Sequence, residues 1–64
     1  METEKSSEDY RPLILVAEDD DSNFKLIKAI IGKKCDIIWA RNGQEAVSLY
    51  RENYDKLDAI LMDI

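Results

Sequence analysis

Three short, predominantly apolar segments, separated by two stretches with helical spacing, constrain the fold of this chain more than any other feature. The segments span residues 13–17, 36–40 and 57–62. Every residue of the first segment is apolar, which is typical of a strand buried on both faces in a parallel sheet. The alternation predicts an α/β fold with the order β-α-β-α-β, in which right-handed crossovers make the strands parallel.

Polar residues stand where the two predicted helices begin and end. Asp and Ser side chains at 19–22 can cap a first helix, whose apolar residues recur at helical spacing over 24–31 before Gly32 ends it. A second helix is predicted after Asn42, which forms a capping box with Glu45. An Asn-Gly pair at this point could also form a hairpin turn, but the helical spacing that follows favours the helix.

The composition excludes several kinds of site. The chain has no histidine, so it cannot contain a histidine-based metal site or a Ser-His-Asp nucleophile. Fourteen acidic and nine basic residues give a net charge of −5, which argues against a nucleic-acid or membrane surface. Because Cys35 is the only cysteine, we expect neither an intrachain disulfide nor a zinc site.

The first twelve residues differ in composition from the rest. Residues 1–12 are charged and serine-containing without an apolar run, which predicts a flexible linker or tail before a domain at 13–64. This opening does not resemble a signal peptide, and no segment has the length of a membrane span, so we expect a cytoplasmic location. A domain of this size buries a small core, which favours a partner chain or an assembly.

Acidic residues follow two of the predicted strands. Glu18 and Asp19 come after the first strand, and Asp63 comes after the third. Ligands of open α/β sheets bind beyond the carboxyl ends of the strands. Neighbouring carboxylates repel one another unless a cation neutralises them, and Mg²⁺ favours carboxylates together with waters and phosphate oxygens. An Asp in such a site can also accept a phosphoryl group.

A structural role is the alternative interpretation of each acid. Asp19 and the acids after it can favour the positive end of the first helix. Asp63, taken alone, can be an ordinary exposed acid at a strand end. Position alone does not decide between these interpretations.

Three motifs together resemble the receiver domain of two-component response regulators. They are LILVAEDDDSN at 13–23, ARNGQEA at 40–46 and DAILMDI at 58–64. Each motif alone is weak, but an acidic pair after the first strand, Asn-Gly before the second helix and an Asp closing the third strand form a specific combination. The resemblance implies a flavodoxin-like half-domain with a three-stranded parallel sheet in the order 2-1-3.

The resemblance also implies roles for the acids. Asp63 matches the residue that accepts a phosphoryl group from a histidine kinase or phosphotransfer domain. Glu18 and Asp19 match the acidic pair that holds Mg²⁺ with Asp63, where Asp19 is the direct ligand and Glu18 can act through water. A hybrid sensor histidine kinase is one kind of parent protein for such a module, which is a phosphoacceptor rather than a conventional enzyme.

Receiver domains continue for about as many residues again beyond the point that matches Ile64. Their second half carries a Ser/Thr and a Lys that contact the phosphoryl group, so we expect phosphoacceptor activity in this truncated chain to be impaired. The third strand, which is central in the family, becomes an edge strand that invites pairing with another chain. We therefore expect a homo-oligomer that covers residues 59–62. Two other functions stay open, namely a non-catalytic acidic interaction module and a self-associating folding fragment.

Overall fold

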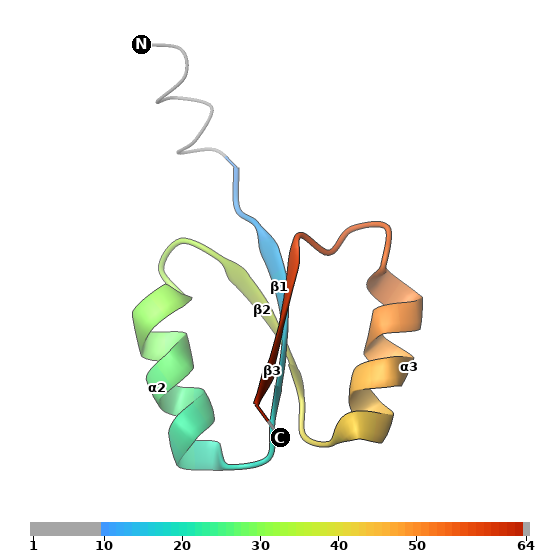
Figure 1. The fold of residues 1–64 in the computed structure, drawn as a ribbon. Helices are drawn as coiled ribbons and strands as arrows, with labels where there is room; N and C mark the ends of the chain where they lie inside the picture. Colours follow the sequence, from blue (N-terminus) through green and yellow to red (C-terminus); the bar gives the residue numbers. More distant parts are fainter. Residues whose placement is uncertain (1–9, 64) are drawn as a thin grey trace, which may run out of the picture.

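A computed structural model describes residues 10–63 and shows the predicted order of strands and helices (Figure 1). The elements are β1 (Leu13–Glu18), α2 (Asp21–Ile31), β2 (Asp36–Ala40), α3 (Gly43–Asn53) and β3 (Ala59–Asp63). The strands form one parallel sheet in the order β2-β1-β3. The two helices lie on opposite faces of this sheet. The predicted α/β fold with strand order 2-1-3 is confirmed.

Two parts of the predicted domain division lie outside the described residues. These are residues 1–9, which make up most of the predicted linker, and Ile64 at the end of the predicted domain. Within the described residues, no helix is long and apolar enough to cross a membrane.

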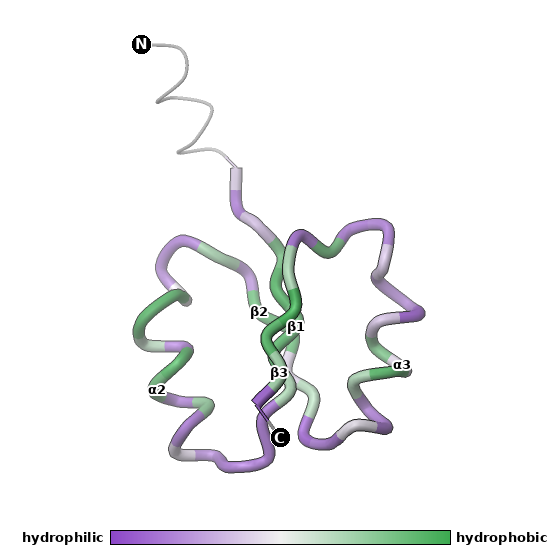
Figure 2. The backbone as a smooth tube through the Cα atoms, viewed as in Figure 1, coloured by the Kyte–Doolittle hydropathy of each residue, from purple (hydrophilic) through white to green (hydrophobic). Residues whose placement is uncertain are grey.

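β1 is the central strand and forms the most buried part of the fold. Its residues Leu15, Val16 and Ala17 are at most 1% exposed. β1 has a strand on either side and a helix over either face, which explains why its sequence is continuously apolar. Figure 2 shows the strands as largely hydrophobic and the connections at their ends as hydrophilic.

The two faces of the sheet pack differently. On the α3 face, four buried residues form the core, with three partly buried residues against them. The buried residues are Leu15, Ala17, Ala40 and Ala46, and the others are Ile38, Leu49 and Leu57. On the α2 face, Phe24 stacks on Trp39 with ring centroids 3.9 Å apart and the ring planes 3° from parallel. The core is small because alanine fills much of it.

Both helices begin at the caps that the sequence predicts. The Asp20 carboxylate accepts hydrogen bonds from the backbone N–H groups of Ser22 and Asn23 at 2.7 and 3.3 Å. At α3, Asn42 accepts from the backbone N–H of Glu45 at 2.8 Å. The Glu45 carboxylate accepts from the backbone N–H of Arg41 at 2.8 Å, whereas a capping box would have it accept from Asn42 itself. Helix α3 excludes the hairpin alternative.

β3 starts later than the apolar segment at 57–62 predicts. The backbone N–H of Leu57 donates to the carbonyl of Asn53 at 3.0 Å, so Leu57 still belongs to the turn that ends α3. The Asp58 carboxylate accepts hydrogen bonds from the Tyr10 hydroxyl and from the backbone N–H of Leu13. These two hydrogen bonds lower the pKa of Asp58. Asp58 therefore joins the start of β1 to the residue before β3, and the strand begins at Ala59.

Arg11 connects the segment before β1 to the loop between α2 and β2. Its guanidinium forms an ion pair with Asp36 at 3.0 Å. It also donates to three backbone carbonyls between α2 and β2, those of Gly32, Lys33 and Cys35, at 2.9–3.1 Å. Gly32 is the C-cap of α2, so Arg11 supports the end of this helix and also holds the loop that follows it.

Candidate functional site

The sheet brings together two of the three acidic residues predicted to form the site. Glu18 and Asp63 are the last residues of β1 and β3, and they are direct partners in the parallel register. Asp19 follows Glu18 in the loop that leads to α2. The carboxyl ends of β1 and β3 and the N-terminus of α2 lie at the same end of the molecule (Figure 1).

The three carboxylates differ in their exposure. Glu18 is only 1% exposed, whereas Asp19 and Asp63 are exposed. One carboxylate oxygen of Glu18, Oε2, accepts a hydrogen bond from the backbone N–H of Asp20 at 3.1 Å. The other, Oε1, is buried and has no hydrogen-bond partner among the described residues. A buried carboxylate oxygen without a hydrogen-bond donor destabilises the folded state. Of the three carboxylates, Glu18 therefore has the least favourable environment for a negative charge.

The neighbours of Glu18 add to this cost. Burial is the main cause that raises the pKa of Glu18, and it outweighs the Asp20 backbone N–H, which lowers this pKa. The carboxyl group of Asp63, and to a smaller extent that of Asp19, raises the pKa of Glu18 further. Ionised carboxylates can only accept hydrogen bonds. A proton shared with a neighbouring acid, a cation or a water molecule can each satisfy Glu18 Oε1.

The side chains at this edge are of the chemical type that binds a divalent cation. Mg²⁺ is commonly held by one or two carboxylates with water and phosphate oxygens completing its shell. Glu18 Oε1, together with Asp63 or Asp19, offers this kind of donor set. Among residues 10–63, no three Asp, Glu, Cys or His side chains are arranged as a ready metal site. The ligand set of Glu18, Asp19 and Asp63 therefore stays a prediction.

Two residues near the carboxylates have contacts that the sequence interpretation missed. The indole Nε1 of Trp39 donates to the backbone carbonyl of Glu18 at 2.8 Å. The guanidinium carbon of Arg41 lies 4.2 Å from the centre of the Trp39 ring, and its Nη1 pairs with Asp21 at 3.4 Å. The sequence suggests only a partly buried tryptophan, because its contact with Glu18 depends on how β1 and β2 align.

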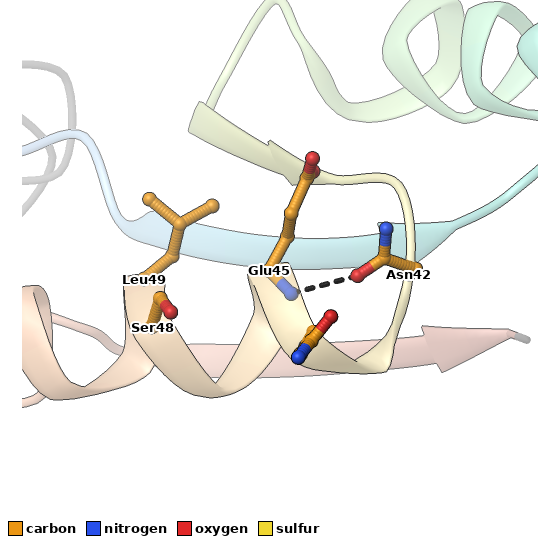
Figure 3. A pocket seen from close by; sticks show the side chains of 5 residues that line it. Asn42, Glu45, Ser48 and Leu49 are labelled. Atoms are coloured by element: carbon orange, nitrogen blue, oxygen red, sulfur yellow. Dashed lines mark hydrogen bonds between the residues drawn. The ribbon is translucent and has the colours of Figure 1, made fainter.

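A concavity lies beside the first turns of α3 (Figure 3). It has a volume of about 590 Å³ and is lined by Asn42, Gln44, Glu45, Ser48 and Leu49. The Asn42 amide oxygen and the Glu45 carboxylate are already engaged in capping α3. None of the three predicted site residues lines this concavity. The carboxyl edge of the sheet is the better candidate because Glu18 and Asp63 pair there and Glu18 Oε1 has no partner among the described residues.

Comparison with known proteins gives one match that bears on function. The chain is 46% identical over 55 residues to hybrid signal transduction histidine kinase I of Dictyostelium discoideum. The chain is therefore similar to a short segment of a signal transduction histidine kinase. The match covers 80% of this chain but only 3% of the length of that kinase. No family model and no solved structure matches the chain. The relationship supports a general role in signal transduction.

Proposed function

We propose that the chain is a receiver module of a two-component phosphorelay, in which Asp63 accepts a phosphoryl group with the help of Mg²⁺. The observation that carries this proposal is the pairing of Glu18 and Asp63 at the carboxyl ends of adjacent parallel strands, with Glu18 Oε1 buried and without a partner among residues 10–63. The relationship to a hybrid histidine kinase supports the same proposal. A histidine kinase or a phosphotransfer domain would be the phosphoryl donor.

The positions of the carboxylates suit this transfer. Asp63 is exposed at the end of β3, so a phosphorylated histidine of another domain can approach it. An Asp63 carboxylate oxygen forms the new bond to phosphorus while the bond from phosphorus to the histidine nitrogen breaks, and the electron pair leaves with the imidazole. Glu18 and Asp19 would hold the cation. Mg²⁺ held there would supply positive charge that offsets the charge of the phosphoryl oxygens.

Uptake from a small acyl phosphate donor tests the proposal. We expect intact-mass spectrometry to show one added phosphoryl group on a fraction of the wild-type chain, and much less without Mg²⁺; conversion should be incomplete because activity is expected to be impaired. Asp63→Asn should show none, since an amide oxygen is a poor nucleophile. Asp55→Asn removes an acid that is exposed in the turn after α3, and this matched control should keep the uptake. Equal uptake by wild type and Asp63→Asn, or no uptake by wild type, would contradict the proposal.

We also propose that β3 pairs with β3 of a second copy. Among the described residues β3 has β1 as its one neighbour, and all five of its residues are exposed. Beside it lies an apolar groove of about 370 Å³ between β3 and α3. Antiparallel pairing about Leu61 would set Ile60 opposite Met62 of the second copy. It would also set each Asp63 opposite Ala59, so that no like charges face one another.

The mass of the chain in solution tests this pairing. Light scattering should give twice the mass of one chain for wild type and the mass of one chain for Leu61→Lys, because a charge at the centre of an edge strand opposes pairing. Leu26→Lys changes an exposed leucine on α2 and should leave the mass of two chains. A wild-type mass of one chain would overturn the proposal.

A further inference from the structure

The pairing of β1 with β2 ends one residue before its pairing with β3. On the β2 side the last pair is Ala17 with Ala40, while on the β3 side it is Glu18 with Asp63. Glu18 thus extends beyond the last pair with β2. In place of a strand residue, the indole Nε1 of Trp39 donates to the Glu18 carbonyl at 2.8 Å. A side chain here provides the hydrogen bond that a longer β2 would supply.

Contacts on both sides hold the Trp39 ring in place. Phe24 lies parallel to it at 3.9 Å, so one face of the ring is covered. The Arg41 guanidinium lies 4.2 Å from the ring centre, so it must lie over the other face. Arg41 is itself paired with Asp21 at 3.4 Å. With both faces covered, the indole N–H has a fixed direction, and this direction is toward Glu18.

We infer that Trp39 is a positioning residue for the carboxylate site. Its N–H fixes the backbone carbonyl of Glu18, and with it the point from which the Glu18 side chain reaches toward Asp63. This inference rests on the proposed function, because it takes Glu18 and Asp63 as groups that act on Mg²⁺. Sites of this kind require their ligands to be held to within about 0.5 Å by surrounding contacts. Residues that orient metal ligands through hydrogen bonds commonly affect affinity.

The structure offers two variants that separate positioning from packing. Trp39→Phe keeps an aromatic ring between Phe24 and Arg41 but lacks the N–H that reaches Glu18. Phe24→Leu keeps the Trp39 N–H but removes the aromatic stack. If Trp39 acts only by packing, the two variants should change stability and Mg²⁺ binding together. If Trp39 positions Glu18, only Trp39→Phe should weaken Mg²⁺ binding beyond its effect on stability.

Calorimetric titration with Mg²⁺, alongside thermal unfolding of each variant, distinguishes these cases. We expect Trp39→Phe to raise the Kd for Mg²⁺ roughly three- to tenfold, as the loss of one hydrogen bond implies. We expect Phe24→Leu to lower the melting temperature and to leave the Kd unchanged. Wild-type binding with an unaltered Kd in Trp39→Phe would overturn the inference and leave the proposed function intact. Absence of Mg²⁺ binding by wild type would overturn the metal site of the proposed function and the inference with it.

A spectroscopic measurement on the unsubstituted chain covers the case in which Trp39→Phe does not fold. Trp39 is the only tryptophan in the sequence, so its indole N–H gives one proton resonance. Addition of Mg²⁺ should shift this resonance in wild type and not in Glu18→Gln. A resonance that does not move while calorimetry shows Mg²⁺ binding would overturn the inference.

Discussion

Glu18→Gln is expected to raise the melting temperature of the metal-free protein at neutral pH and to abolish the further rise that Mg²⁺ produces. The wild-type side chain is 1% exposed and leaves Oε1 without a donor among the described residues, beside other carboxylates. A glutamine of the same shape removes the buried charge and keeps an oxygen for the Asp20 N–H. The substitution also removes the anionic ligand. We therefore expect the metal-free protein to become more stable and Mg²⁺ binding to be lost.

The pH dependence of stability provides a second measure of the same substitution. Burial raises the pKa of Glu18 above its value in the unfolded chain, so the folded state holds this proton more tightly. The contribution of Glu18 to the free energy of unfolding therefore falls as pH rises from about 4.3, the ordinary pKa of a glutamate, through the raised pKa. Glu18→Gln should lack this decline. Glu52→Gln, an exposed control on α3, should match wild type. A lower melting temperature for Glu18→Gln in metal-free buffer would contradict the account.

Leu15→Ala is expected to unfold most of the protein. Leu15 is 1% exposed and lies in the centre of β1, in the core under α3. Replacing a buried leucine by alanine costs about 2–5 kcal/mol. At roughly 0.05–0.15 kcal/mol per residue, the whole stability of so short a domain is of similar size. Far-UV circular dichroism should show a loss of helix and sheet signal at 25 °C.

An exposed leucine provides the matched control for this substitution. Leu26 on α2 is 61% exposed, and Leu26→Ala makes the same chemical change outside the core. Surface substitutions of this kind are usually within about 0.5 kcal/mol of wild type. Leu26→Ala should therefore keep the wild-type spectrum and melting temperature. Cooperative unfolding of Leu15→Ala at the wild-type temperature would show that the core is not where the structure has it.

The sequence predicts which helices and strands form better than it predicts the residues at which they begin and end. The strand predicted from the unbroken apolar run and the helix caps predicted at Asp20 and Asn42 depend on local features, and all three are confirmed. The strand order does not follow from local patterns, since alternation gives parallel strands in more than one order. The strand order 2-1-3 was predicted from the resemblance to receiver domains. The start of β3 was predicted too early because Leu57, although apolar, completes the turn after α3 and packs against the core from there.

The candidate site was predictable only in part for a similar reason. The position of acids at strand ends indicates that Glu18 and Asp63 share one edge, and the register makes them direct partners. Burial of Glu18, however, depends on the elements packed around it, and no sequence pattern specifies which of several consecutive acids is buried. The contact of Trp39 with Glu18 depends on the lengths of two strands. The apolar pattern of a sequence does not locate the end of a strand to within one residue.

Locating the phosphoryl group on the chain tests the central claim most directly. After treatment with a small acyl phosphate donor and Mg²⁺, borohydride reduces an aspartyl phosphate to homoserine and leaves free carboxylates unchanged. Peptide mass spectrometry then identifies the position that was phosphorylated. The account predicts homoserine at position 63 and at none of the acids at 18–21. Homoserine among residues 18–21, or at no position, would contradict the assignment of Asp63 as the phosphoacceptor.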